Sequence, residues 1–169
     1  MDRVQKKILL LGDGAVGKTS LVHRFVEGVF NERYKATIGV DIFSKTVTTD
    51  SGSEIELQLW DLSGQAHFSA VRSKFYNKAD GALLVFDLTN KKTFENLDSW
   101  INEATSGVGS EIPMFLLGNK VDLSDLVAIG DDEITNFAGT KNWGWSKSSA
   151  KTGENVEGAF KSIASVVTD

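Results

Sequence analysis

The chain has 169 residues, of which 41% are hydrophobic, and its formal net charge is −5 at pH 7. This length suits one compact core and leaves little for a second, so we expect residues 1–169 to form a single domain. The acidic balance argues against a broad basic surface of the kind that binds nucleic acids or anionic membranes, and we expect no nucleic-acid partner.

The cysteine content and the first residues bear on the compartment. The chain has no cysteine, which excludes disulfides, thiolate zinc sites and prenyl or palmitoyl attachment to the chain as given. Residue 2 is Asp rather than Gly, which excludes N-myristoylation, and the apolar run 8–11 is too short for a signal peptide or a transmembrane segment. We therefore expect a cytoplasmic protein. The sequence assigns no membrane association, and a lipidated tail in a longer chain stays an open alternative.

Strand patterns alternate with helix patterns along the chain, which is typical of an α/β fold. Continuous apolar runs at 8–11, 82–86 and 114–117 predict strands that are covered on both faces in a parallel sheet. Between residues 38 and 60 apolar and polar residues alternate around a turn at 50–53. This pattern predicts an antiparallel hairpin at the sheet edge.

Helical spacing of apolar residues appears at 94–104 and again at 156–167. Each set places its apolar side chains on one face, so both helices are expected to pack on the sheet. Weaker patterns predict helices near 17–27, 66–76 and 131–139.

A glycine-rich segment with the spacing G-x-x-x-x-G-K-T follows the first predicted strand directly, Gly12-Asp13-Gly14-Ala15-Val16-Gly17-Lys18-Thr19. Glycines let successive N–H groups point inward at a phosphate, and the next helix adds the positive end of its dipole. Lys18 would reach the terminal phosphates, and the Thr19 hydroxyl would bind Mg²⁺. The alternative is a chance glycine-rich turn, which the flanking strand and helix disfavour. The expected nucleotide contacts here are Gly14, Ala15, Val16, Gly17, Lys18, Thr19 and Ser20.

A second polar segment, Asn119-Lys120-Val121-Asp122, follows the third apolar run and therefore lies at the carboxyl end of a strand, where such sheets bind ligands. The Asp122 carboxylate can accept both N1–H and the 2-amino group of guanine, whereas adenine presents an acceptor at N1. Asn119 would tie the base and the neighbouring loops together, and the Lys120 stem can lie against the base. Taken alone, the segment could be a polar loop at a strand exit, but its position after the phosphate loop favours guanine recognition.

These segments, in this order, resemble the motifs of the Ras superfamily of small GTPases, and most closely those of its Rab group. The resemblance covers residues 5–167. The matching motifs are 12–19, Thr37 within Tyr34-Lys35-Ala36-Thr37-Ile38-Gly39-Val40-Asp41, Trp60-Asp61-Leu62-Ser63-Gly64-Gln65, Asn119-Lys120-Val121-Asp122 and Ser149-Ala150-Lys151. It implies the small G domain of the P-loop NTPases, with a six-stranded, mostly parallel sheet, one antiparallel edge strand and helices on both faces.

The resemblance also implies a role for each matching position. Thr37 would bind Mg²⁺ together with Thr19 and would also sense the γ-phosphate, and Asp61 would hold Mg²⁺ through water. Gln65 would orient the attacking water, with Lys18, Thr37 and Gly64 stabilising the transferred phosphoryl group. The remaining base contacts would come from Phe30, which stacks on guanine, and from the 6-oxygen loop of Ser149, Ala150 and Lys151.

Three departures from the family pattern leave alternatives open. Leu62-Ser63 stands in place of Thr-Ala, Ala66 in place of Glu, and Ile42 in place of an aromatic residue. The leading expectation is a monomeric switch that hydrolyses GTP, whose effectors, exchange factor and GTPase-activating protein bind at about 32–42 and 62–76. A very slowly hydrolysing, GTP-bound scaffold is the second reading. A small-molecule phosphotransferase is the third, disfavoured by the intact guanine motif.

Overall fold

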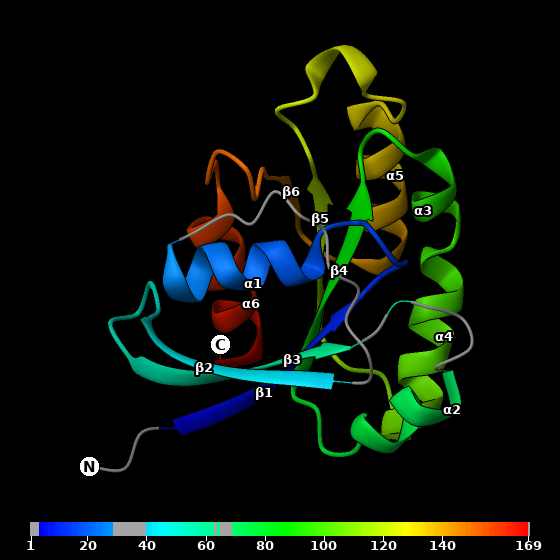
Figure 1. Cartoon of the computed structure of the whole chain (residues 1–169). Helices are drawn as coiled ribbons and strands as arrows, with labels where there is room; N and C mark the ends of the chain where they lie inside the picture. Colours follow the sequence, from blue (N-terminus) through cyan, green and yellow to red (C-terminus); the bar gives the residue numbers. More distant parts are fainter. Residues whose placement is uncertain (1–3, 29–39, 63, 65–68, 169) are drawn as a thin grey trace.

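The computed structural model describes residues 4–28, 40–62, 64 and 69–168, and a six-stranded sheet forms its centre (Figure 1). The order across the sheet is β2-β3-β1-β4-β5-β6, with β2 antiparallel to β3 and every other neighbouring pair parallel. The predicted α/β class, with six strands and one antiparallel edge strand, is confirmed. The strands are β1 (Val4–Leu11), β2 (Val40–Thr48), β3 (Glu54–Leu62), β4 (Gly81–Asp87), β5 (Met114–Asn119) and β6 (Trp145–Lys147).

The strand patterns reflect how each strand is covered. Every residue of β4 and of β5 is buried, which is why both appear in the sequence as continuous apolar runs. In β3, Ile55, Leu57 and Leu59 are buried while the residues between them are more exposed. The β2–β3 hairpin turns at Gly52, whose φ of +88° lies in the left-handed region that glycine tolerates best.

Two helical layers enclose the sheet (Figure 1). On one face α1 (Lys18–Glu27) and α6 (Val156–Thr168) pack together, and the rings of Phe25 and Phe160 stack at 4.2 Å between centroids. The other core cluster, on the opposite face, includes Leu97 and Ile134 from two further helices. The remaining elements are α2 (Ser69–Arg72), η2 (Ser73–Phe75), α3 (Lys91–Glu95), α4 (Leu97–Val108), η3 (Ser124–Leu126) and α5 (Asp131–Lys141), where η2 and η3 are 3₁₀ helices.

The prediction of a single helix at 94–104 is wrong in one respect, because the chain forms two helices that meet at Asn96. The Asn96 N–H bonds back to the Lys92 carbonyl and ends α3, while its own carbonyl accepts from the Ser99 and Trp100 N–H groups and begins α4. The apolar spacing continues across this junction and hides the break. The predicted helices at 17–27 and 131–139 are confirmed as α1 and α5, and 66–76 contains α2 and η2 in its described part. No helix in the described ranges is long and apolar enough to cross a membrane.

Candidate functional site

The phosphate loop predicted at 12–19 lies between β1 and α1, at the carboxyl edge of the sheet. Gly12 has φ +150°, and a Cβ atom there would overlap the Val85 carbonyl oxygen of β4. Gly17 has φ +102°, and a Cβ atom there would overlap the side-chain nitrogen of Asn119 at the end of β5. Both positions therefore require glycine, because the loop crosses directly over the ends of two strands.

Lys18 is the cation of this loop, and its side chain is 6% exposed. Its Nζ donates to the Gly12 carbonyl at 2.6 Å and to the Asp13 carbonyl at 3.2 Å, so the side chain curls back over the loop. Burial lowers the pKa of Lys18 to about 8, against the opposing influence of the Asp61 and Asp13 carboxylates. A buried ammonium group is stabilised by a neighbouring anion, and a bound phosphate would provide one.

The other predicted residues of this region lie as the loop requires. Gly14, Ala15 and Val16 form its turn, with Ala15 at φ +67°, and Ser20 lies in the first turn of α1. A Cβ atom at Gly64 would come within 2.5 Å of the Gly12 oxygen and the Gly14 nitrogen. The Gly64 backbone therefore lies directly against the phosphate loop.

Thr19 and Asp61 bring two oxygen ligands together from α1 and β3. The Thr19 hydroxyl donates to Asp61 Oδ2 at 2.7 Å, and Asp61 is fully buried. A hydroxyl and a carboxylate oxygen suit Mg²⁺, which takes one or two protein ligands together with phosphate oxygens and water. In the described part of the chain there is no group of three or more His, Cys, Asp or Glu side chains that could hold a metal ion.

Asn119 connects three segments of the site. Its Nδ2 donates to the Val16 carbonyl of the phosphate loop at 2.9 Å. Its Oδ1 accepts from the Ser148 hydroxyl and from the Ala150 N–H, each at 3.3 Å. Asn119 therefore joins the phosphate loop to the loop that begins at Ser148.

Lys120 forms a second bridge from the base-binding segment to the phosphate loop. Its Nζ donates to the Ala15 carbonyl at 2.9 Å and pairs with Asp87 Oδ2 at 2.8 Å. Asp87, the last residue of β4, was not predicted from the sequence as part of the site. Its position directly after the apolar run 82–86, at the same strand edge, is the signal that could have found it.

Asp122 lies beside the 149–151 loop, as guanine recognition would need. The Ser149 hydroxyl donates to Asp122 Oδ1 at 2.7 Å and accepts from the Thr152 N–H at 3.0 Å. Ser149 and Ala150 are buried, whereas Lys151 is exposed. The carboxylate and the Ala150 N–H thus belong to one hydrogen-bonded loop system.

The phosphate loop has a further support that the sequence analysis missed. Asn96 Nδ2 donates to Asp13 Oδ2 at 2.7 Å, and Trp100 Nε1 donates to Asp13 Oδ1 at 2.8 Å. The Arg72 guanidinium lies 4.4 Å from the centre of the Trp100 ring and pairs with Glu103 at 2.9 Å. Asp13 is separated from its two partners by 83 and 87 residues, so no local pattern reveals these contacts.

Three of the predicted site residues, Phe30, Thr37 and Gln65, lie outside the described residues. The same holds for Ser63 and Ala66, two of the three departures from the family pattern.

The family model described as Ras family matches residues 7–169. The chain is 38% identical to "Ras-related protein Rab-1" of Theileria parva over 164 residues, and this alignment covers 96% of this chain and 74% of that protein. It is 38% identical over 157 residues to "Ras-related protein RABA1b" of Arabidopsis thaliana, covering 93% and 72%. It is also 38% identical over 158 residues to "Ras-related protein Rab-8B" of Homo sapiens, covering 94% and 76%.

Proposed function

Because this chain belongs to the Ras family, as a Rab-like small GTPase that hydrolyses GTP, we propose that it binds GTP or GDP with Mg²⁺ and signals through two nucleotide-dependent states. The observation that carries this proposal is the position of Asn119. One side chain bonds both to the phosphate loop, through Val16, and to the base loop, through Ala150. The two ends of a nucleotide would therefore be held by one connected structure.

Each end of that structure has the chemistry for one part of the ligand. Asp122 would accept N1–H and the 2-amino group of guanine, and the Ala150 N–H, whose nitrogen lies 3.3 Å from Asn119 Oδ1, would be shared between that oxygen and the guanine 6-oxygen. Lys18 and the loop N–H groups would hold the phosphates. Mg²⁺, bound directly by Thr19 and Thr37 and through water by Asp61, would neutralise charge on the phosphate oxygens. Phe30 would stack on the base.

Hydrolysis would depend on positioned groups rather than on covalent chemistry. We assign the orientation of water to Gln65 and γ-phosphate contacts to Lys18, Thr37 and Gly64. In the sequence, Arg33 is one residue away from the position at which heterotrimeric G proteins carry an arginine finger in cis. We therefore expect the missing positive charge to come from a partner, and hydrolysis by the protein alone to be slow, about 10⁻⁴ s⁻¹.

The resemblance to Rab proteins supports a role in membrane traffic or signalling, with effectors, an exchange factor and a GTPase-activating protein binding at about 32–42 and 62–76. We propose that the protein acts there as a monomer. The departures at Ser63 and Ala66 favour a second candidate, a GTP-bound scaffold with even slower turnover.

Identification of the bound nucleotide tests the proposal. The purified full chain is denatured with acid, and the released small molecules are separated by anion-exchange chromatography beside nucleotide standards. GDP supports the hydrolysing switch, and GTP supports the scaffold. If the protein carries no guanine nucleotide and binds none when GDP and Mg²⁺ are added, the proposal is wrong.

A further inference from the structure

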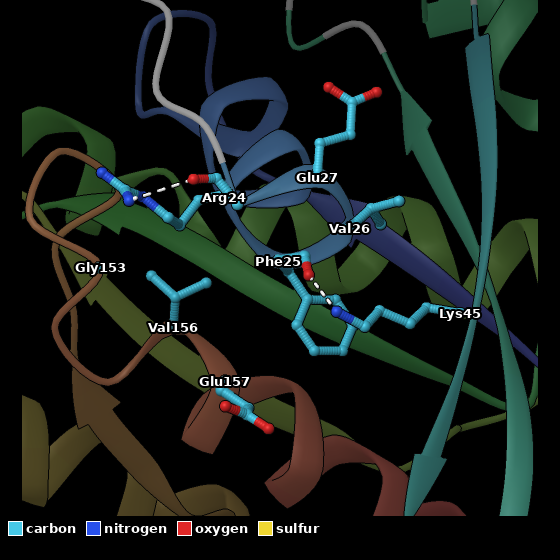
Figure 2. A pocket seen from close by; sticks show the side chains of 9 residues that line it. Arg24, Phe25, Val26, Glu27, Lys45, Gly153, Val156 and Glu157 are labelled. Atoms are coloured by element: carbon cyan, nitrogen blue, oxygen red, sulfur yellow. Dashed lines mark hydrogen bonds between the residues drawn. The ribbon is translucent and has the colours of Figure 1, made fainter.

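Arg24, one turn before the end of α1, reaches the base-binding loop from outside the nucleotide site. Its Nε donates to the Ala150 carbonyl at 2.9 Å, and a terminal nitrogen donates to the Lys151 carbonyl. The other terminal nitrogen faces the Gly28 carbonyl at 3.5 Å, the contact drawn in Figure 2. One guanidinium therefore joins the end of α1 to two consecutive carbonyls of a loop more than 120 residues away.

Both carbonyls belong to the segment expected to read the guanine 6-oxygen. On its inner side this segment is held by Asn119, which accepts from the Ala150 N–H at 3.3 Å, and by the Ser149–Asp122 hydrogen bond at 2.7 Å. Arg24 holds it on the outer side. A planar guanidinium presents donors in a fixed fork, which suits two neighbouring carbonyls better than the single charged point of lysine does.

Arg24 also lines a cavity of about 450 Å³ between α1, β2 and the start of α6 (Figure 2). Lys45 of β2 lines the same cavity, and its Nζ donates to the Phe25 carbonyl at the end of α1. Lys45 thus bonds to the same end of the helix as Arg24, but its described hydrogen bond does not reach the base loop. This difference makes Lys45 a matched control.

We propose that Arg24 is a positioning residue for guanine recognition. Its guanidinium fixes the 149–151 loop so that the Ala150 N–H meets the guanine 6-oxygen, and this contact slows nucleotide release. The proposal rests on the proposed binding of guanine nucleotides. It also gives the end of α1 a role in nucleotide retention that none of the predicted motifs includes.

The test compares GDP with 2-aminopurine riboside diphosphate, which has the same ribose and phosphates but lacks both the 6-oxygen and the N1–H. The loss of N1–H acts on Asp122, which is unchanged in every variant, so a change in selectivity between the parent and an Arg24 variant reports on the 6-oxygen. In R24M the side chain keeps an unbranched stem but loses the guanidinium and with it both carbonyl contacts. We expect GDP to dissociate about tenfold faster, since each lost hydrogen bond weakens the loop by a factor of a few. The affinity ratio of GDP to the analogue should fall by a similar factor. R24K, which can satisfy one carbonyl, should release GDP about threefold faster, and K45M should stay within twofold of the parent.

The outcomes separate the alternatives. Release of GDP from R24M within twofold of the parent overturns the inference. So does an equal loss of affinity for GDP and the analogue, because that result would mean Arg24 supports only the fold. If R24M does not fold, the selectivity ratio of R24K decides in the same way. If the parent protein itself binds no GDP, the proposed function has failed, and the inference fails with it.

Discussion

At the scale of single residues, Asn119 shows why an amide is needed at the end of β5. Its nitrogen donates to Val16 and its oxygen accepts from Ser148 and Ala150. A carboxylate at this position would lose the donor, and an apolar side chain would lose both functions. Since Asn119 is 2% exposed, water could not replace the missing partner, and the two loops would separate.

Asp122→Asn should change the preferred base. The new amide oxygen can still accept from the Ser149 hydroxyl, which lies 2.7 Å from Asp122 Oδ1, so the loop should keep its shape. The amide NH₂ would then oppose the guanine 2-amino group but match the 2-oxygen of xanthine. Replacing a match by a mismatch should shift the ratio of GDP to XDP affinity by about two decades.

Competition between GDP and XDP at fixed Mg²⁺ measures this ratio for the parent and for Asp122→Asn. A Ser124→Ala variant, in the neighbouring 3₁₀ helix η3, serves as a surface control. A variant that prefers GDP as strongly as the parent would show that Asp122 does not read the base.

Gln65→Leu should separate binding from hydrolysis. The glutamine would position water rather than ligand, so its loss should leave GTP affinity within a few-fold of the parent and slow single-turnover hydrolysis at least tenfold. Rapid-quench measurement of phosphate release, together with equilibrium binding of a GTP analogue, checks both parts. Unchanged hydrolysis would assign the positioning of water to another residue.

At the scale of elements, α4 supports the phosphate loop from the side. Asp13 lies in a loop that would hold anionic phosphates, and the Asn96 and Trp100 donors at 2.7 and 2.8 Å neutralise part of its charge and fix its direction. The break between α3 and α4 is what leaves Asn96 at a helix junction with its side chain directed at Asp13. The irregularity in the helix therefore serves the site.

Trp100→Phe should weaken nucleotide retention without removing the core side chain. The ring stays in place, but the Nε1–H donor to Asp13 is lost, so we expect GDP release to be about fivefold faster. Trp143→Phe is the control. Trp143 packs on the same core but lies before the amino end of β6, whereas the phosphate loop lies at the carboxyl end of β1. Stopped-flow release of a fluorescent GDP analogue distinguishes the two variants, and equal rates for both would contradict this role of α4.

The elements also show what a sequence can predict. β4 and β5 were predictable because burial on both faces leaves a continuous apolar run. The loops at 12–19 and 119–122 were predictable because their chemistry is carried by neighbouring residues. Arg24, Asp87, Asn96 and Trp100 were not predicted, since their roles depend on which helix or strand end lies beside which loop. The junction at Asn96 escaped prediction for a different reason, namely that the apolar periodicity runs through it unbroken.

At the scale of the whole molecule, we expect nucleotide-dependent change to concentrate beside the phosphate loop. The stretches 32–42 and 62–76 flank Thr37 and Gly64, which would contact the γ-phosphate. Hydrogen exchange measured in the GDP state and with a slowly hydrolysed GTP analogue should differ in these stretches. It should be the same in β4 and β5, whose residues are all buried and which provide an internal control. Identical exchange at 32–42 and 62–76 in both states would contradict the switch.

The order of the strands has a consequence for which ligands fit. The phosphate loop follows β1, the base segment follows β5, and β4 lies between them. Neighbouring strands are about 4.8 Å apart, so the two binding segments begin about 10 Å from each other. The sheet thus fixes the distance between the two segments. The Asp87–Lys120 ion pair joins the end of β4, the strand between them, to the segment that follows β5. Loop substitutions such as those at 63 and 66 can change rates and partners, but the separation of the two segments is set by the two strand spacings from β1 through β4 to β5.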